Sequence, residues 1–304
     1  MFNLFVEQAK NIDPDYMSMI IPARWYNGGM GLKQFRENMI NDRRIVKLVD
    51  YINAKDCFPT VDIAGGLCYF LWKNGADEDC VVTNITAGRE ITLRRALNKY
   101  DSLFVRYNES IPIIDKVRSQ TEHFMDETVS AIDTFGIPSK EKGHENYQPG
   151  DLKLLHSVGA NSQGMSYISP DKVTKGKDLI EKYKVKISIM VPQNGEVGVR
   201  PENGYRSIST PYILYPGEVD TFSYLNIGFF DTEEEARNFK AFMECKFPRF
   251  LMRNTYSSVH ISQSNFIFVP VLDMHIKWTD KTLYEKYGLT EQEIELVENM
   301  MRVM

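Results

Sequence analysis

Hydrophobic residues in the N-terminal part of the chain alternate between helical and strand-like spacing, which is typical of an α/β domain. Apolar residues recur every three or four positions in two segments, which predicts helices at residues 1–11 and 32–40. Apolar runs bounded by polar loops predict strands at residues 17–21, 44–52 and 65–72. Asn74-Gly75 then favours a hairpin between the last of these strands and a further strand at residues 80–85.

This order of elements is typical of the second half of a doubly wound sheet. A helix comes first, as if the chain entered the fold at an internal crossover, and strands and helices then alternate until an antiparallel hairpin. We therefore expect residues 1–83 to form the C-terminal half of a Rossmann-like α/β sheet whose first half lies outside this sequence.

The pattern of residues 84–304 predicts a mixed α+β domain. Ser110 with Pro112 just behind it favours a helix towards Gln120. Thr232 and Thr290 each precede a glutamate by three positions, and such a capping box predicts a helix after each threonine. Residues 135–150 are expected to form an exposed loop, and short strands are expected at residues 185–191, 212–215 and 266–272.

The composition indicates a folded protein with no membrane span and no metal site. Of the 304 residues, 43% are hydrophobic, which suffices for substantial cores. No apolar run reaches about 18 residues and the N-terminus lacks a signal-peptide pattern, so we expect a cytoplasmic protein. The four cysteines form no C-x-x-C pair and the histidines show no ligand spacing, so we predict no metal ligands.

The charge of the chain leaves two interpretations of its lysine-rich segment. The net charge of −5 argues against a protein that binds nucleic acid by bulk charge. Between Lys153 and Lys186, however, seven lysines stand against three acidic residues. Such a run forms either a solvated surface or a basic face on an otherwise acidic protein.

Three segments carry a resemblance to a known family: IIPARWYNGGMGLKQFR, DCFPTVDIAGGLCYFLW and the C-terminal WTDKTLYEKYGLTEQEIELVENMM. Together they resemble restriction–modification DNA adenine methyltransferases of the gamma class. The likeness is strongest to large type II proteins in which the methylase and the target-recognition domain share one polypeptide. The resemblance implies a partial methyltransferase domain at residues 1–83 and a target-recognition, DNA-binding domain at residues 84–304.

The resemblance also implies which parts of the reaction this chain lacks. Family members hold S-adenosylmethionine at a Gly-rich turn and the target adenine at a loop with two consecutive prolines, and the sequence has neither motif. Asp13-Pro14-Asp15-Tyr16 lacks the second proline and stands between a helix and a strand, so we interpret it as a turn. We expect no catalytic residue and no cofactor site here: S-adenosylmethionine belongs to the intact enzyme, and this chain alone is expected to be inactive.

One aromatic residue is implied as an active-site contribution. In the resembling enzymes an aromatic side chain at the position of Phe58 stacks on the flipped target base, replacing the stacking that the base loses. The alternative is that Phe58 is a core residue at a strand entry. The loop at residues 24–31 is the next candidate for DNA contacts, because its glycines allow close approach and Arg24 suits a phosphate. A permissive turn is the alternative; the candidate contacts are Arg24, Asn27, Gly28 and Gly29.

In the second domain the resemblance points to residues that read or hold DNA. Asn161 and Gln163 have the amide geometry for an adenine edge, while basic side chains suit phosphates. The candidate phosphate contacts are Lys172, Lys175, Lys177, Lys184, Lys186, Arg249 and Arg253.

We therefore expect the DNA-binding and target-recognition portion of an adenine-specific methyltransferase of a restriction–modification system. Its expected partners are double-stranded DNA and the missing N-terminal catalytic half, in cis or as a separate subunit, with no membrane. A protein-interaction module without a nucleic-acid role is the alternative. Salt separates the two, because DNA binding weakens steeply as salt rises and an apolar interface does not.

Overall fold

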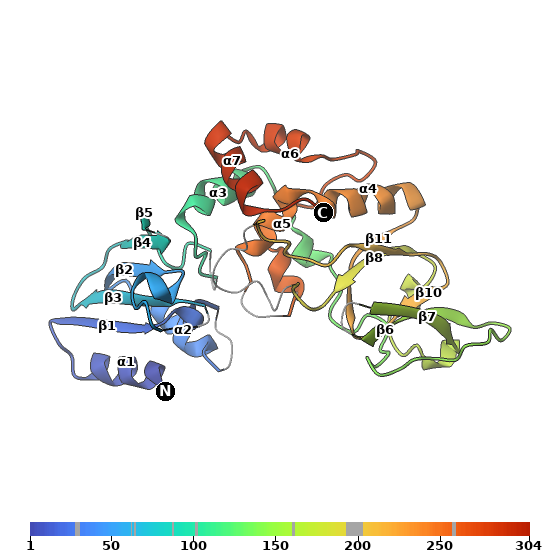
Figure 1. Cartoon of the computed structure of the whole chain (residues 1–304), viewed down its shortest axis with the longest axis horizontal. Coiled ribbons are helices and arrows are strands. Elements are labelled where there is room, and N and C mark those ends of the chain that lie inside the picture. Colours follow the sequence, from blue (N-terminus) through green and yellow to red (C-terminus); the bar gives the residue numbers. More distant parts are fainter. Residues whose placement is uncertain are drawn as a thin grey trace. The chain divides into compact units, whose positions relative to one another are not determined.

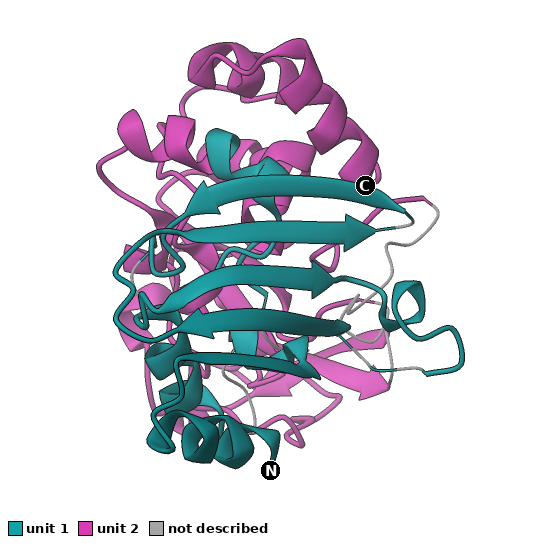
Figure 2. Ribbon diagram, turned by 90° about the vertical axis from the view of Figure 1, so that its left-hand side faces the viewer, with its two compact units in different colours: residues 1–113, 196–202, 254–258 teal, residues 114–195, 203–253, 259–304 magenta. Residues whose placement is uncertain are grey.

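The computed structural model describes residues 1–27, 31–61, 63, 65–86, 88–100, 103–159, 162–192, 203–256 and 260–304. The chain folds as two compact units, coloured separately in Figure 2. Unit 1 is built mainly from residues 1–113, and unit 2 from residues 114–192, 203–253 and 260–304. Unit 1 thus extends well past residue 83, because a strand spans that position and pairs with the strand that follows it.

Unit 1 combines one sheet with two main helices, in the order that the sequence pattern predicted (Figure 1). The predicted helices and strands in residues 1–86 are all present, and β5 is an addition. The elements are α1 (Phe2–Asn11), β1 (Tyr16–Pro22), α2 (Lys33–Ile40), β2 (Ile45–Tyr51), β3 (Leu67–Lys73), β4 (Cys80–Thr86) and β5 (Arg89–Arg95). The fold of this unit is therefore mixed α/β.

The strand order of the sheet is β1-β3-β2-β4-β5. Strands β1 and β2 both pair antiparallel with β3, so they run parallel to each other and α2 connects them. The predicted hairpin of residues 65–72 with 80–85 is wrong, because β2 lies between β3 and β4 and pairs in parallel with β4. The hairpin forms instead one step later, between β4 and β5.

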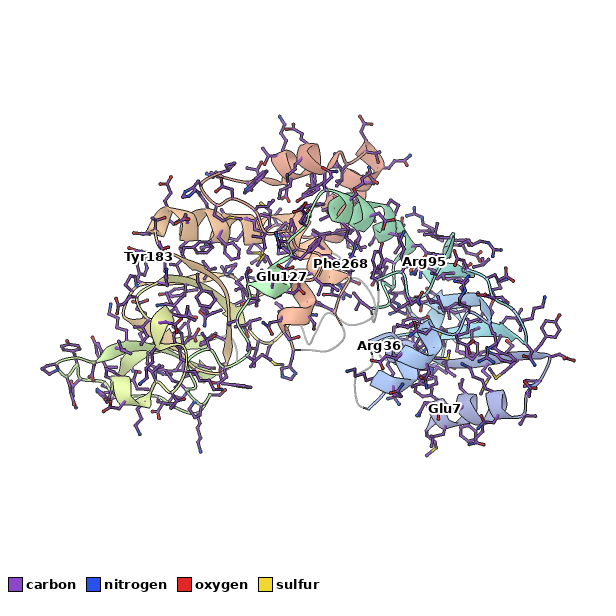
Figure 3. The ribbon with its side chains drawn as sticks, turned by 180° about the vertical axis from the view of Figure 1, so that it is seen from behind. Glu7, Arg36, Arg95, Glu127, Tyr183 and Phe268 are labelled. Carbon is purple, nitrogen blue, oxygen red and sulfur yellow. The ribbon has the colours of Figure 1, made fainter. Side chains whose placement is uncertain are left out.

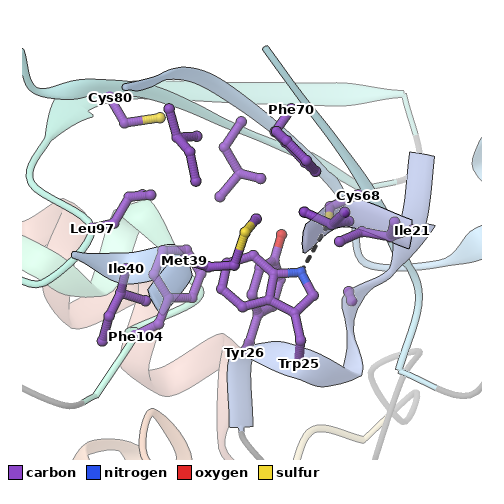
Figure 4. Close-up of a cluster of buried hydrophobic side chains, with 14 of the residues drawn as sticks. Ile21, Trp25, Tyr26, Met39, Ile40, Cys68, Phe70, Cys80, Leu97 and Phe104 are labelled. Carbon is purple, nitrogen blue, oxygen red and sulfur yellow. Dashed lines mark hydrogen bonds between the residues drawn. The ribbon is translucent and has the colours of Figure 1, made fainter. Parts of the chain in front are cut away.

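The core of unit 1 lies between the helices and one face of this sheet (Figure 4). Trp25, Tyr26 and Phe104 pack ring against ring, with centroids of Tyr26 and Phe104 4.5 Å apart. The indole N–H of Trp25 donates to Cys68 Sγ at 3.3 Å. The residues just after β1 are thereby fixed by large buried side chains.

Unit 2 holds two three-stranded sheets and most of the helices. Strand order is β10-β6-β7 in one sheet and β11-β8-β9 in the other. The elements are α3 (Ile111–Ser119) at the unit boundary, β6 (Leu152–Gly159), β7 (Ser162–Ile168), β8 (Tyr183–Ser188), β9 (Tyr212–Leu214), β10 (Glu218–Asp220), β11 (Tyr224–Phe230), α4 (Glu233–Glu244), α5 (Lys246–Arg253), α6 (Asp280–Tyr287) and α7 (Glu291–Met300).

The helix predictions in unit 2 are confirmed, and one strand prediction is wrong. Thr232 and Thr290 both form complete capping boxes, which begin α4 and α7. Residues 266–272 form no strand: a short helix, η8 (Gln263–Phe266), ends there and a single bridge joins Phe124 to Pro270. Phe266, Phe268 and Val269 are buried, so the apolar run in this segment reflects packing in the core and not a strand. No helix among the described residues is long and apolar enough to cross a membrane.

Candidate nucleic-acid interface

Phe58 lies on the loop that follows β2, and its ring is accessible. Asn53 begins the loop, where its side-chain Oδ1 accepts a hydrogen bond from the backbone N–H of Lys55 at 3.1 Å. The backbone N–H of Phe58 then donates to the carbonyl of Ala54 at 2.8 Å. The Phe58 side chain is 40% exposed. It is therefore not a core residue, and its ring can be reached by a ligand.

Arg24 lies near the same edge of the sheet as the Phe58 loop. It directly follows β1, in the short helix η1 (Ala23–Asn27), and is exposed beside two buried neighbours, Trp25 and Tyr26. Because β1 and β2 are parallel, their C-terminal ends lie on the same side of the sheet, which is the side where open α/β sheets bind ligands. Asn27 ends η1, while Gly28 and Gly29 lie outside the described residues.

A buried polar cluster, which the sequence patterns did not reveal, secures the C-terminal end of β2. Asp50 is fully buried and accepts hydrogen bonds from Arg106 Nε at 2.7 Å and Nη2 at 2.8 Å. Burial lowers the pKa of Arg106, but the charge of Asp50 outweighs it, so the net shift is upwards. Asn84 Nδ2 also donates to Asp50, at 3.2 Å. This cluster stabilises the strand end from which the Phe58 loop departs.

In unit 2, the structure exposes three of the predicted lysines on one loop, residues 170–179, here called the lysine loop. Val173 anchors it in the core with Phe135, while Thr174 N–H donates to the Phe135 carbonyl at 3.1 Å. Lys175 Nζ is 2.6 Å from Asp133 Oδ2, an ion pair at the surface. Lys172, Lys175 and Lys177 point outwards from this anchored loop.

Lys184 and Lys186, in contrast, are internal, so they are not placed to contact phosphates as predicted. They are 0% and 3% exposed. Lys184 Nζ donates to the Ile180 carbonyl at 2.6 Å, and Lys186 Nζ lies 4.0 Å from the ring centre of Tyr224. Burial lowers the pKa of each lysine to about 8.

Both lysines face a buried carboxyl group. Burial raises the pKa of Asp220 to about 7, against the opposing effect of a hydrogen bond from Asn226 and the charges of the lysines. Asn226 Nδ2 donates to both carboxyl oxygens of Asp220 at 3.1 Å. These groups form an internal charge cluster rather than a surface for DNA.

The two arginines predicted as phosphate contacts are also structural. Arg249 is fully buried and donates to four backbone carbonyls, those of Glu244, Cys245, Arg206 and Arg302, at 2.8–3.1 Å. Arg253 is buried with its guanidinium carbon 4.1 Å from the ring centre of Tyr205. Arg249 and Arg253, which flank aromatic residues in the sequence, are therefore buried side chains of α5.

The predicted amide readers are only partly described. Asn161 lies outside the described residues. Gln163 is exposed on β7, but its side-chain oxygen accepts a hydrogen bond from Lys186 Nζ at 2.9 Å. A bidentate contact to adenine requires both the oxygen and the amide N–H₂. In this conformation Gln163 therefore offers only its N–H₂ group. Among the described residues, no group of three or more His, Cys, Asp or Glu side chains is placed to hold a metal ion.

Two comparisons match known methylases over part of the chain. The family model of the Eco57I restriction-modification methylase matches residues 1–58. An uncharacterized adenine-specific methylase of Mycoplasma pneumoniae (strain ATCC 29342 / M129 / Subtype 1) is 36% identical over 74 residues, which is 24% of this chain and 18% of that protein. The chain is related to restriction–modification adenine methyltransferases. This confirms the family resemblance.

The family match covers the first elements of unit 1, up to the loop after β2. The match begins at α1 and ends at Phe58 itself. A structure of the type IIG restriction endonuclease BpuSI aligns with 98% of this chain and 48% of that one, at 11% identity and a TM-score of 0.36. The chain thus spans about half of that protein, and its match covers under a fifth of the Mycoplasma pneumoniae methylase.

Proposed function

We propose that this chain is the DNA-binding and target-recognition portion of an adenine-specific methyltransferase of a restriction–modification system. The observation that carries the proposal is the lysine loop, which holds Lys172, Lys175 and Lys177 outwards on a segment fixed to the core. Lysine side chains on an anchored loop suit the regular phosphates of duplex DNA. The relationship of the chain to methylases supplies the reason to expect DNA as the partner.

Unit 1 is proposed to be the end of a Rossmann-like sheet that a catalytic half completes. Its β1-α2-β2 connection joins parallel strands through a helix, as in doubly wound folds. Strand β1 pairs only with β3 among the described strands, so its other edge can accept a further parallel strand. That half, in cis or as a separate subunit, would hold S-adenosylmethionine and the catalytic residues.

Within the completed enzyme, Phe58 is proposed to stack on the flipped adenine. Its exposure and its position at the ligand-binding edge support this role. Stacking of a base on an aromatic side chain is worth about 1–3 kcal/mol. Arg24, near the same edge, would hold a neighbouring phosphate.

A protein-interaction role remains the second candidate, and exposed apolar side chains of unit 1 favour it. Leu4, Phe5 and Ile12 on and beside α1 and Ile20 on β1 are exposed. Exposed apolar groups of this kind are typical of docking surfaces. The catalytic half is one partner that would cover them, and an unrelated protein is the other.

Salt dependence tests the proposal directly. We expect the purified chain to bind labelled duplex DNA, measured by fluorescence anisotropy, with an affinity that falls steeply between 50 and 200 mM salt. Each phosphate contact contributes roughly 0.9 to the slope of log affinity against log salt. Absence of binding at low salt, or binding that salt leaves unchanged, would contradict the proposal and favour the protein-interaction role.

A further inference from the structure

Unit 2 contains a cavity lined by four tyrosines, here called the tyrosine pocket. Its volume is about 580 Å³, which lies within the range of small-molecule sites. Tyr147 and Tyr167 form one side, and Tyr212 and Tyr215 belong to the β9–β10 segment. These residues are far apart in sequence and meet because β10 pairs with β6, beside β7.

Two rings of the tyrosine pocket are too exposed to be core residues. Tyr147 is 59% exposed and Tyr215 is 38% exposed. Each is held by an edge-to-face contact, Tyr147 against Tyr167 at 5.4 Å and Tyr215 against Tyr183 at 5.8 Å between ring centres. Tyr183, labelled in Figure 3, therefore supports the pocket from β8. Fixed, exposed rings around a cavity favour a planar aromatic ligand.

The charged groups of the pocket select the chemistry of that ligand. Asp151 accepts hydrogen bonds from His144 Nε2 at 2.6 Å and from the backbone N–H of Gln148 at 2.7 Å. Glu218 accepts from the backbone N–H of Tyr215 at 3.0 Å. Because protein donors already engage both carboxylates, they are poor partners for a cationic ligand.

Lys153 supplies the positive charge. Its side chain is largely exposed, and Nζ is 3.5 Å from Glu218 Oε1, so a ligand phosphate at Lys153 would compete with this carboxylate. A lysine beside tyrosine rings matches a phosphate attached to a planar base. Proteins also bind unstacked bases without base-specific hydrogen bonds in this way, with aromatic rings stacking on the bases and basic side chains holding the phosphate backbone.

We propose that the tyrosine pocket binds one unstacked nucleotide of a DNA strand, with the base against the tyrosine rings and its phosphate at Lys153. The proposal deepens the proposed function and rests on it, since it requires that unit 2 lie against DNA. It differs from the Phe58 site, which belongs to unit 1 and to the target adenine.

The test compares two DNA duplexes with the full chain. One is fully paired and the other carries a single unpaired nucleotide, and affinities are measured by fluorescence anisotropy at one salt concentration. We expect the bulged duplex to bind roughly tenfold more tightly, in line with the energy of one base–aromatic stack. Combined Tyr147→Ala and Tyr215→Ala substitutions should remove this preference.

Three controls separate stacking from loss of structure. The Tyr147→Phe and Tyr215→Phe pair keeps the rings and should keep the preference. Tyr16→Ala removes a comparably exposed tyrosine from unit 1 and should also keep it. Thermal unfolding of each variant identifies any that fails to fold, in which case Tyr147→Ala alone, at the most exposed ring, replaces the pair.

Each outcome decides the proposal. If the wild-type chain binds both duplexes equally, or if the alanine pair keeps the preference, the tyrosine pocket does not bind a base while the proposed function stands. If neither duplex binds, the proposed function fails. In that case, titration with deoxyadenosine monophosphate, followed by tyrosine fluorescence, decides whether the tyrosine pocket is a nucleotide site. Saturable binding that the alanine pair abolishes supports a nucleotide site, and absence of binding overturns it.

Discussion

Lysine residues of unit 2 show how far one residue type can diverge in role. The lysine loop projects Lys172 and Lys177 into solvent, whereas Lys184 and Lys186, a few positions later on β8, are buried beside Asp220. In sequence all four belong to one basic run, and only burial separates them. An alternating strand pattern places Lys184 and Lys186 on one face but cannot show that another part of the fold covers that face.

The internal charge cluster predicts a pH dependence of stability. The folded pKa of Asp220 is raised to about 7 from its ordinary value of 3.8, so between these values the folded state binds more protons than the unfolded state. The free energy of unfolding contributed by Asp220 therefore falls as pH rises through this window, by up to about 1.4 kcal/mol per pH unit. This stabilising contribution is fully present below pH 3.8 and lost above about pH 7.

The Asp220→Asn variant lacks this titration. Between pH 5 and 7, the free energy of unfolding of the wild type, measured in urea, should decrease by about 2 kcal/mol more than that of the variant. Asp231→Asn, an exposed carboxyl group paired with Lys182, is the matched control and should follow the wild type. Parallel profiles for wild type and Asp220→Asn would show that Asp220 is already ionised at pH 5.

At the scale of elements, local signals predicted what depends on neighbouring residues and missed what depends on distant ones. The capping boxes at Thr232 and Thr290 are local, and both helices begin there. The β3–β4 hairpin was predicted from Asn74-Gly75, yet β2 inserts between these strands. Strand order is decided by which strands bury a common core, and a turn dipeptide does not contain that information.

The lysine loop owes its position to a glycine. Gly176 has a φ of +55°, and a Cβ there would lie 2.6 Å from the Thr134 carbonyl oxygen. Gly288, at the end of α6, has a φ of +61° with open space around it. Gly288→Ala should cost about 1 kcal/mol for the left-handed backbone alone. Gly176→Ala should cost at least about 1 kcal/mol more, as measured by urea unfolding. Equal costs would mean that the loop shifts freely away from Thr134.

For the whole molecule, the sequence predicted more of unit 1 than of unit 2. The alternation of helices and strands in residues 1–86 is a strong pattern, and the family model matches residues 1–58 of this region. In unit 2, Arg249 and Arg253 resemble surface contacts in sequence, but α5 is buried on all sides. The tyrosine pocket was also missed, because its residues meet only through the pairing of β6 with β7 and β10.

A comparison of two triple lysine variants tests whether the lysine loop holds duplex DNA. Replacing Lys172, Lys175 and Lys177 with alanine should flatten the slope of log affinity against log salt by up to about 2.7, since each phosphate that loses its lysine accounts for roughly 0.9. Replacing the exposed Lys277, Lys281 and Lys286 changes the net charge equally and should leave the slope near that of the wild type. Equal slopes for the two triple variants would contradict DNA binding by the lysine loop, because the loop would then contribute only its charge.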